Sequence, residues 1–572
     1  MTVSVAELVG TVLGRLGIGH AFGVVGSGNF HVTNSLRAAG VPFTATRHEA
    51  GAATAADAHA RTTGVPAVLS VHQGCGLTNA LTGITEAAKS RTPLLVLAAD
   101  TGGAAVRSNF RIDQDALVTA VGAVAERVHS PGSALADTVR AYRTAVEQRR
   151  TVVLNLPLDV QAAEVPGLGS LDDLDVPDLA PLAPPRPAAS SVAALAAVLA
   201  GARRPVFVAG RGARAAGPEL AGLAQRCGAL LATSAVANGL FTGNSWSLGI
   251  SGGFATPLAA ELITDADVVV GWGCALNMWT MRHGALIGAG ATVVQVDLDA
   301  DALGANRTVD LGILGDVAAT AADVAVALDG DDRPGYRTDD VRARVAAHGR
   351  WRDVPFDPPD LTGPEGIDPR VLSVGLDDAL PAERSVTVDS GNFMGYPAAY
   401  LAVPDEAAFC FTQGFQSIGL GLFTAIGVAL ARPDRLTVAA LGEPSRGSGS
   451  RWSSWSTTTA ATAPRSTTSA PTATTSPPSS SRRPTSPPSA GATASTPSPS
   501  GPPPTSPAST NGSRAPGPGH CSSTPRSPPT AVPGGSQRPS AATDTPARNL
   551  TVVRTPDQNR EVAPGSWIRA GR

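Results

Sequence analysis

Residues 1–159 alternate between short apolar runs and longer segments with helical spacing. The runs HAFGVVG, PAVLSVHQG and TPLLVLAAD have the length and composition of buried strands, and HEAGAATAADAHAR and LTNALTGITEAAKS are typical of helices. Ser4 and Glu7 form a capping-box pattern before the first helical segment. Strands that alternate with helices predict a parallel sheet covered by helices on both faces.

The same alternation returns twice. Residues 190–330 contain the strand-like runs PVFVAG, DADVVVGWG and ATVVQVDLD, and a GRGAR turn follows the first of them, at the sheet edge where ligands bind in doubly wound domains. The glycines of this turn are also explained by close packing of a helix on its strand, so nucleotide binding stays open. A third block contains the helix DPRVLSVGLDDAL and the strands RSVTVDSG and RLTVAAL.

After Glu443 the pattern stops. We therefore predict an α/β protein with three doubly wound parallel-sheet domains, of which the third is incomplete and is followed by a disordered tail. The predicted ranges are a first domain at 1–170, a linker at 171–189, a middle domain at 190–330, a linker at 331–364, the start of a third domain at 365–443, and a low-complexity tail at 444–572.

Composition excludes several classes of function. The formal net charge of −3 gives no overall attraction to nucleic acid or to an anionic membrane, so neither is expected as a partner. No signal-like start and no apolar run of roughly 20 residues is found, which predicts a cytoplasmic protein. The five cysteines are scattered without a CxxC pair, which argues against a disulfide framework or a structural zinc site.

Three stretches together resemble the thiamine diphosphate enzymes of the acetolactate synthase and benzoylformate decarboxylase type. They are RHEAGAATAADAHARTTGVPAVLSVHQGCGLTNALTG, AGRGARAAG, and DSGNF with TQGFQSIGLGLFTAIGVAL. The resemblance covers residues 1–442 and implies pyrimidine, middle (Rossmann-like) and diphosphate domains, in that order. It also implies thiamine diphosphate and Mg²⁺ as cofactors, a 2-oxo acid substrate, decarboxylation or carboligation, and a homodimer or homotetramer with its site between two chains. FAD in the middle domain is left open.

Two residues carry the implied catalysis. Glu49 matches the family glutamate that hydrogen-bonds the pyrimidine ring and drives its tautomer change. Without the resemblance, the favoured interpretation is an acid in the first turn of a helix, stabilised there by the helix dipole. His72 stands where benzoylformate decarboxylase has an active-site histidine that relays protons. The alternative for His72 is a strand-end histidine bonded to a backbone carbonyl.

The remaining site residues follow from the same resemblance. Ile418 matches the bulky apolar residue that bends the cofactor, although it is also explained as a core residue beside a helix start. The implied cofactor-binding residues are Gly26, Gly391, Asn392, Gly414, Gln416, Ile418 and Gly442. The family next has an aspartate that binds Mg²⁺, and Glu443 occupies that position, so no intact metal site is expected.

The amino-acid composition after Glu443 is typical of translation in a shifted reading frame. Every residue from Pro444 to Thr510 is Pro, Ser, Arg, Gly, Trp, Thr or Ala, all of which can be encoded with G or C at the middle codon base. When the last base of each codon is joined to the next two, Trp452 with Ser453 and Trp455 with Ser456 both read as valine. The re-read segment fits an aliphatic strand followed by an asparagine, so we predict a frameshift near Glu443 and an inactive chain. The alternative is a genuine Ser/Thr/Pro-rich tail.

Two other functions are compatible with parts of the sequence. A non-catalytic binding or regulatory homologue would keep the first two domains for assembly. An NAD-linked oxidoreductase would rest on the GRGAR turn alone.

Overall fold

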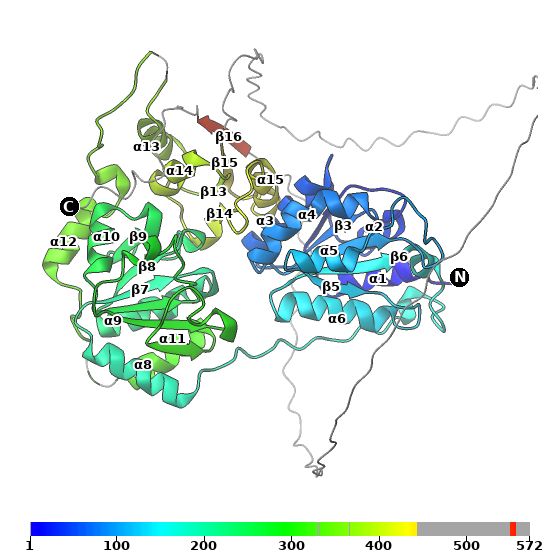
Figure 1. The fold of residues 1–572 in the computed structure, drawn as a ribbon, viewed down its shortest axis with the longest axis horizontal. Helices are drawn as coiled ribbons and strands as arrows, with labels where there is room; N and C mark the ends of the chain where they lie inside the picture. Colours follow the sequence, from blue (N-terminus) through cyan, green and yellow to red (C-terminus); the bar gives the residue numbers. More distant parts are fainter. Residues whose placement is uncertain (1, 329, 331, 365, 443–549, 556–572) are drawn as a thin grey trace, which may run out of the picture. The chain divides into compact units, whose positions relative to one another are not determined.

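The computed structural model describes residues 2–328, 330, 332–364, 366–442 and 550–555, which form three parallel β-sheets flanked by helices (Figure 1). The predicted fold class is thereby confirmed. The predictions for 444–549 and 556–572, including the disordered tail and the frameshift, lie outside the described residues. None of the helices in the described ranges is both long and apolar enough to cross a membrane.

The N-terminal sheet has six strands in the order β2-β1-β3-β4-β6-β5. Its strands are β1 (His20–Gly23), β2 (Phe43–Ala45), β3 (Ala67–Val71), β4 (Leu94–Asp100), β5 (Val124–Arg127) and β6 (Thr151–Pro157). Its helices are α1 (Val5–Arg15), α2 (Phe30–Ala38), α3 (Glu49–Thr63), α4 (Cys75–Lys89), α5 (Gln114–Ala120), α6 (Ala134–Glu147) and α7 (Leu158–Ala162).

Alternate residues of each central strand face opposite layers of helices. Val68 packs in a core with α1, α2 and α6, whereas its neighbour Leu69 packs with α3 and α4. This is the arrangement that strands buried on both faces require. The predicted capping box is confirmed, since the Ser4 side chain accepts from the Glu7 amide and the Glu7 carboxylate accepts from the Ser4 amide.

The middle sheet also has six strands, in the order β12-β11-β10-β7-β8-β9. Its strands are β7 (Pro205–Ala209), β8 (Leu230–Thr233), β9 (Ser247–Ile250), β10 (Val268–Trp272), β11 (Thr292–Asp297) and β12 (Leu311–Leu314). The helices around it are α8 (Ala189–Gly201), α9 (Gly217–Cys227), α10 (Pro257–Thr264), α11 (Val317–Ala327) and α12 (Asp339–His348). The strand order reverses between β7 and β10, which is the point where doubly wound sheets bind ligands.

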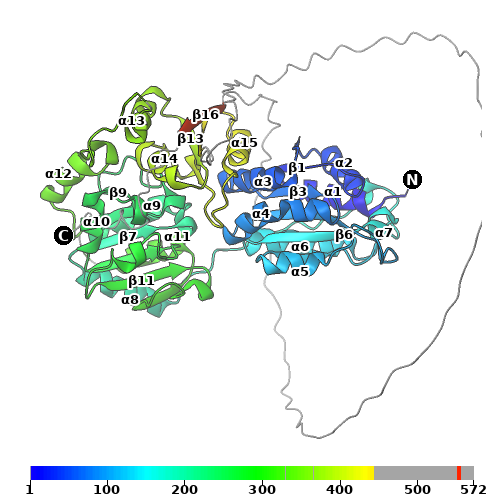
Figure 2. The same ribbon diagram turned by 45° about the horizontal axis from the view of Figure 1, so that its top comes forward.

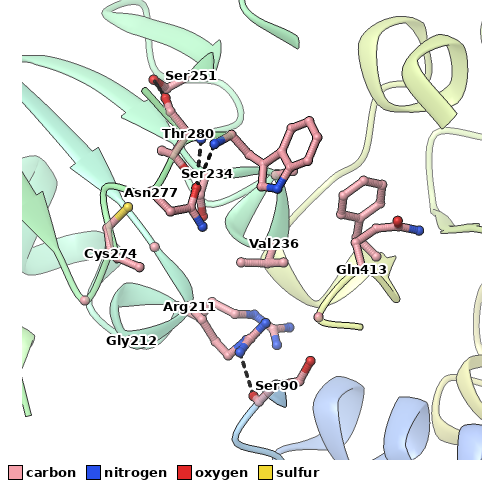
Figure 3. A pocket seen from close by; sticks show the side chains of 18 of the residues that line it. Ser90, Arg211, Gly212, Ser234, Val236, Ser251, Cys274, Asn277, Thr280 and Gln413 are labelled. Carbon is pink, nitrogen blue, oxygen red and sulfur yellow. Dashed lines mark hydrogen bonds between the residues drawn. The ribbon is translucent and has the colours of Figure 1, made fainter. Parts of the chain in front are cut away.

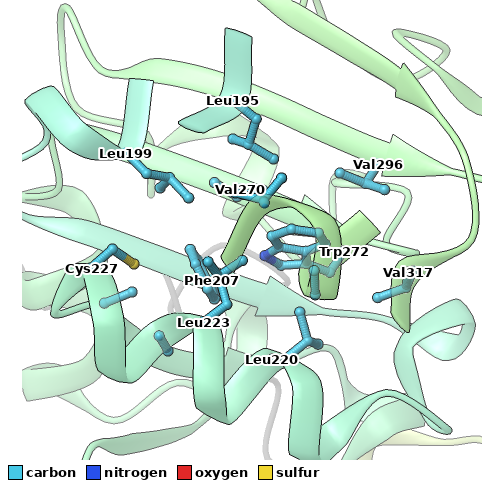
Figure 4. Packing of buried hydrophobic residues seen from close by; sticks show 14 of the residues in the cluster. Leu195, Leu199, Phe207, Leu220, Leu223, Cys227, Val270, Trp272, Val296 and Val317 are labelled. Carbon is cyan, nitrogen blue, oxygen red and sulfur yellow. The ribbon is translucent and has the colours of Figure 1, made fainter. Parts of the chain in front are cut away.

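One face of this sheet is sealed by a large aliphatic and aromatic core (Figure 4). Trp272 is fully buried there and meets Phe207 edge-on, with ring centroids 5.3 Å apart. On the opposite face, Val341 and Val345 of α12 pack against the sheet. Helix α12 lies inside the range predicted to be a linker, and that part of the prediction is wrong, because two valines at helical spacing bury this helix on the sheet.

The third sheet has the order β14-β13-β15-β16. Its strands are β13 (Arg384–Val388), β14 (Phe409–Phe411), β15 (Leu436–Gly442) and β16 (Leu550–Thr555), and its helices are α13 (Pro369–Ala379), α14 (Gly395–Tyr400) and α15 (Gly421–Ala431). Strand β16 pairs with β15 in parallel, from Thr437 opposite Leu550 to Gly442 opposite Thr555. Residues 550–555 therefore differ from the prediction of an unstructured tail.

Helix α3 of the N-terminal sheet lies beside α15 of the third (Figure 2). Gly51 on α3 sits against the Phe423 ring, and Gly427 on α15 sits against the backbone of Ala55. Small residues at these positions allow the two helices to approach closely.

Candidate functional site

Glu49 is held at the first turn of α3. The His48 side chain caps this helix by accepting from the Ala50 amide at 3.2 Å. The Glu49 side chain is only 8% exposed, and its Oε2 accepts from Nδ2 of Asn79, on α4, at 3.0 Å. A carboxylate fixed at a helix N-terminus fits the interpretation based on the helix dipole and also fits a poised catalytic acid.

His72 follows directly after β3 and lies close to Glu49. Its Nε2 is 3.3 Å from Oγ of Ser27, and its Nδ1 is 3.2 Å from the carbonyl oxygen of Gln73, so the backbone-bonded interpretation describes part of its geometry. A Cβ on Gly26 would lie 2.4 Å from the His72 ring. A Cβ on Gly76 would lie 3.1 Å from Cβ of His72 and 3.5 Å from Oε1 of Glu49. The structure therefore brings Gly26, His72 and Glu49 together around bare glycine backbone.

The loop that follows β14 carries the second group of predicted residues. Gln416 adopts φ +62°, a left-handed conformation that non-glycine residues rarely hold without a reason. The side chain of Ile418 is 73% exposed, so its interpretation as a core residue is wrong.

Asp389 fixes the far end of this loop. Its Oδ1 accepts from the amides of Ser390 at 2.7 Å and Gly419 at 3.0 Å, which ties the end of β13 to the start of α15. Sequence reasoning missed this residue, although it opens the DSGNF motif that was singled out.

Three further predicted residues gather at the carboxyl ends of β13 and β15. Gly391 has φ 142°, and Asn392 begins a short 3-10 turn that contains Phe393. A Cβ on Gly442 would lie 2.8 Å from the Phe393 ring. The structure thus groups Gly391, Asn392 and Gly442, and packing against Phe393 accounts for the small residue at 442. Their binding of a diphosphate stays a prediction.

Glu443, which the resemblance places at the metal-binding position, follows Gly442 in the sequence. Glu443 falls outside the described residues, so its predicted place in a metal site is not addressed by the structure. Within the ranges that the structure does describe, no cluster of three or more His, Cys, Asp or Glu side chains is placed to hold a metal ion.

A cleft of about 4230 Å³ runs along the carboxyl edge of the middle sheet (Figure 3). Of the predicted residues, it is lined by Asn392, Gly414 and Gln416. Glu49, His72, Gly26 and Ile418 are not among its lining residues. The predicted site therefore separates into one group around Glu49 and another on the third sheet, with only the second open to this cleft. Whether FAD occupies the cleft stays open.

The backbone amides of the two glycines in the GRGAR turn donate hydrogen bonds within the protein. The amide of Gly210 donates to the carbonyl of Trp272 at 2.8 Å, and that of Gly212 donates to the carbonyl of Gly273 at 3.1 Å. Arg211 donates through Nη1 to the carbonyl of Ser90 at 2.6 Å (Figure 3). These glycine amides are committed to the neighbouring loop and are not free to hold a phosphate, so the close-packing explanation of the turn is favoured over NAD binding.

A buried charge network was not found from the sequence. Arg61 on α3 donates through Nε to Oδ1 of Asp57 at 2.8 Å and through Nη2 to Oε1 of Glu86, on α4, at 2.8 Å. Both carboxylate side chains are fully buried. The spacing of Asp57 and Arg61, four residues apart in a predicted helix, was the available signal for the first pair.

The network perturbs the titration of its members. Burial raises the pKa of Asp57, and the Arg61 charge offsets this only in part. For Glu86, burial also acts to raise the pKa, but the charge and hydrogen bonds of Arg61 and two backbone amides outweigh it, so the pKa lies below its usual value. Burial, followed by repulsion from Arg61, lowers the pKa of Arg211 to about 10. The Glu86 carboxylate therefore stays ionised in the interior.

Comparisons with known proteins match this architecture. Residues 3–117 match the family described as thiamine pyrophosphate enzyme, N-terminal TPP binding domain, and residues 192–324 match the thiamine pyrophosphate enzyme central domain. The chain is 28% identical over 452 residues to the probable 2-ketoarginine decarboxylase AruI of Pseudomonas aeruginosa, covering 77% of each chain.

Two other relatives carry different activity names. The sulfoacetaldehyde acetyltransferase of Alcaligenes xylosoxydans xylosoxydans is 28% identical over 458 residues, with 75% of this chain and 74% of the relative covered. The acetolactate synthase large subunit of Parasynechococcus marenigrum is 26% identical over 459 residues, with 78% and 72% covered.

Proposed function

Because the chain belongs, by its N-terminal and central domains, to the thiamine pyrophosphate enzymes, we propose that its frame-intact form decarboxylates a 2-oxo acid or transfers the resulting acyl unit, and that the printed chain is inactive. Relatives named as a decarboxylase, an acetyltransferase and an acetolactate synthase support an enzyme of the lyase or transferase class. The individual substrate is not set by these names, since they differ among themselves.

The observation that carries the proposal is the setting of Glu49. Its carboxylate is buried, one oxygen accepts from Asn79, and the other faces the glycine backbone at Gly76. A carboxylate held in one orientation beside backbone that carries no side chain is suited to hydrogen-bond a planar ring. These residues therefore fit the pyrimidine half of a thiamine diphosphate site.

When bound, thiamine diphosphate supplies a nucleophilic carbon and an electron sink for the carbon–carbon bond that breaks. In this proposal Glu49 holds a proton against the pyrimidine ring nitrogen, and His72 exchanges protons with the substrate oxygen. Gly26 leaves room beside the His72 ring. Gln416 and Ile418 orient the rings, which is consistent with the special backbone of one and the exposed side chain of the other.

Exposed apolar side chains in the loop after β14 support a second copy of the chain as partner. Phe415 is 47% exposed and Ile418 is 73% exposed, and both lie in the loop that the family places against another subunit. We propose a homodimer or homotetramer in which Glu49 of one chain faces Ile418 of another.

The proposal of inactivity rests on the metal half. Mg²⁺ that carries a diphosphate requires several hard oxygen ligands, and the family supplies an aspartate followed later by an asparagine. This sequence has Glu443 and Pro444 in place of the aspartate and its glycine, and no Asn, Asp or Glu follows from Pro444 to Thr510. Thiamine diphosphate would therefore lack the ion that fixes its charged end.

Calorimetric titration with thiamine diphosphate and Mg²⁺ tests the proposal. We expect a frame-restored chain to bind the cofactor and the printed chain to bind at least about 100-fold more weakly, because the charge-neutralising ion is missing. If neither chain binds, the proposed cofactor is wrong. If both bind equally, the proposed inactivity is wrong.

Glu49→Gln in the frame-restored chain tests the catalytic role. The amide keeps the shape but cannot drive the proton transfer, so turnover of 2-oxo acids should fall by about 10²- to 10⁴-fold while the cofactor still binds. Glu147→Gln, at an exposed helical ion pair with Arg143, is the matched control. Wild-type turnover in Glu49→Gln would show that Glu49 is not catalytic, whereas no turnover in the frame-restored parent chain would favour a non-catalytic homologue that uses the domains for assembly.

A further inference from the structure

Glu86 lies on α4, beside the N-terminal sheet, and its carboxylate binds the loop after β14. Its Oε1 accepts from the amide of Gly414 at 2.9 Å, and its Oε2 accepts from the amide of Phe415 at 2.6 Å. Oε1 also accepts from Oγ of Ser90 at 3.1 Å. The side chain is fully buried, so each of these bonds forms where water does not compete.

Arg61 extends the same hold to the strand itself. Its Nη2 donates to Glu86, and its Nη1 is 3.3 Å from the carbonyl oxygen of Phe411, the last residue of β14. The end of the strand and the first amides of the next loop are therefore both fixed by side chains of α3 and α4.

Other basic groups reach the same place from the middle sheet. Arg211 donates to the carbonyl of Ser90, and Arg214 donates to the carbonyls of Arg61 at 2.9 Å and Glu406 at 2.8 Å. A buried, ionised carboxylate with this many donors is costly to neutralise, because the donors are then left unpaired. The network is thus a rigid support rather than an incidental contact.

We propose that Glu86 is a positioning residue for the loop Gly414–Ile418, holding its backbone so that Gln416 and Ile418 can meet the cofactor. The anchoring of the loop backbone follows from the hydrogen bonds alone. The role of the loop toward the cofactor rests on the proposed function. Glu86 acts through the loop and does not itself touch the reacting atoms.

Hydrogen–deuterium exchange of the full printed chain tests the anchoring. In Glu86→Gln, which keeps the shape and loses the charge, we expect amide exchange in residues 413–419 to accelerate at least about tenfold, since the charge-assisted bonds are weakened. Exchange in β4 should not change. Glu86→Asp keeps the charge but shortens the side chain by one methylene. It should also accelerate amide exchange in residues 413–419.

The controls separate positioning from general stability. Glu126→Gln removes a charge that pairs with Arg140 in the same domain. It should change amide exchange neither in residues 413–419 nor in β4. Unchanged exchange of 413–419 in Glu86→Gln overturns the anchoring, and equal acceleration in 413–419 and β4 reduces Glu86 to a general structural residue. In the frame-restored chain, Glu86→Gln should raise the apparent Kd for thiamine diphosphate at least about tenfold. If only that last result fails, the cofactor role is wrong and the anchoring stands.

A second inference rests on the pairing of β15 with β16. In the N-terminal sheet the third strand, β3, pairs with the fourth, β4, and the sixth, β6, comes only beyond it. The third sheet begins with the same pattern, β14-β13-β15, but the last described strand, β16, pairs directly with β15. In the described residues β16 therefore takes the place beside β15 that β4 takes beside β3, although it lies more than 100 residues further along the chain.

The sequence changes character at both ends of the intervening segment. Between Pro444 and Arg548 there is no Leu, Ile, Phe, Met, Glu, Lys or Tyr, and Leu550 is the first leucine after Leu441. From Asn549 onward Leu550, Glu561 and Ile568 bring back three residue types that the segment lacks, and all three types need A or T at the middle codon base. The return coincides with the first residues that rejoin the sheet.

We infer that the reading frame shifts near Glu443 and is restored shortly before Leu550. Strand β16 is then the authentic last strand of the third sheet. It pairs with β15 because the strand that belongs between them is encoded in another frame, in the segment around Trp452 and Trp455. An unpaired strand edge is a ready template for the next available strand.

Base composition of the gene by codon position decides this inference. In a G+C-rich gene the third codon base carries the highest G+C content. We expect that maximum to move to the second base between about codons 443 and 548 and to return to the third base by codon 550. A maximum at the third base throughout would overturn the inference in favour of a genuine tail. A maximum at the second base through the last codon would show that the frame is never restored.

Discussion

Gly427 on α15 lies directly against the backbone of Ala55 on α3, so that a Cβ at Gly427 would stand 2.2 Å from the Ala55 carbonyl oxygen. The two helices flank different sheets and are far apart in the sequence. Their contact sets how closely the N-terminal and third sheets approach, and hence where the loop held by Glu86 can lie.

Gly427→Ala is therefore expected to destabilise the protein. A methyl group cannot fit against a fixed backbone oxygen, and the helices must separate, at a cost of about 1–3 kcal/mol. Gly222→Ala is the matched control, because Gly222 lies in α9 with open space around it. It should stabilise by about 0.5–1 kcal/mol through helix propensity. Thermal unfolding of both variants measures this, and equal shifts would contradict the packing argument.

Acid should weaken the N-terminal domain through His59 and His20. Burial lowers the pKa of each to about 4, with repulsion from His20 adding to the effect at His59. The folded pKa lies below the unfolded value of 6.5, so between about pH 6.5 and 4 the unfolded chain binds more protons than the folded one. The contribution of these two histidines to the free energy of unfolding is therefore constant above about pH 6.5, falls between pH 6.5 and 4, and is constant again below pH 4. His59→Phe should reduce this slope, whereas exposed His348→Asn should not. Thermal melts at several pH values would show a persistent slope in His59→Phe if the assignment is wrong.

Arg384 should be among the most sensitive residues of the third sheet. It is 2% exposed, pairs with Asp377, and donates to the carbonyls of Ala402 at 2.9 Å and Leu380 at 3.1 Å. Arg384→Met leaves these acceptors buried without donors, which should cost about 3–5 kcal/mol. Arg143→Met, at an exposed pair, should produce no measurable change. Chemical denaturation compares the two, and similar midpoints would contradict the prediction.

Trp272 should tolerate loss of its polar atom but not of its volume. It is fully buried, and its Nε1 has no hydrogen-bond partner within the described ranges. Trp272→Phe removes the unpaired Nε1 but also part of the ring volume, so it should cost clearly less than Trp272→Ala without being neutral. Trp272→Ala should cost about 3–5 kcal/mol, because it empties the centre of the middle core. Urea denaturation followed by circular dichroism measures both, and equal losses would contradict the packing role.

The local elements were predictable because their signals lie within a few residues. The capping box of Ser4 and Glu7, the helix that begins at Glu49, and six strands of the first two sheets follow from short patterns of polar and apolar positions; these strands are β1, β3, β4, β7, β10 and β11. Helix α12 was missed because its apolar stripe is reduced to Val341 and Val345, too few to stand out from a charged segment.

The residues that hold the site together were not predictable in the same way. Nothing near Glu86 in the sequence indicates that its carboxylate meets the amides of Gly414 and Phe415, and nothing near Asp389 indicates Gly419. Glu49 was found through resemblance, but its burial and its bond to Asn79 came only from the structure. A buried acid and an exposed one read alike in a sequence.

The sequence by itself determined the alternation of strands and helices, the α/β class of the three domains, and the change of composition after Glu443. These depend on side-chain periodicity and composition, which are local properties. The tertiary structure alone decided that Gly26, His72 and Glu49 share one place, that Glu86 anchors the loop of the third sheet, and that Leu550–Thr555 pairs with β15. Such pairings depend on which distant segments pack together, because backbone donors and buried charges must find partners wherever the fold places them.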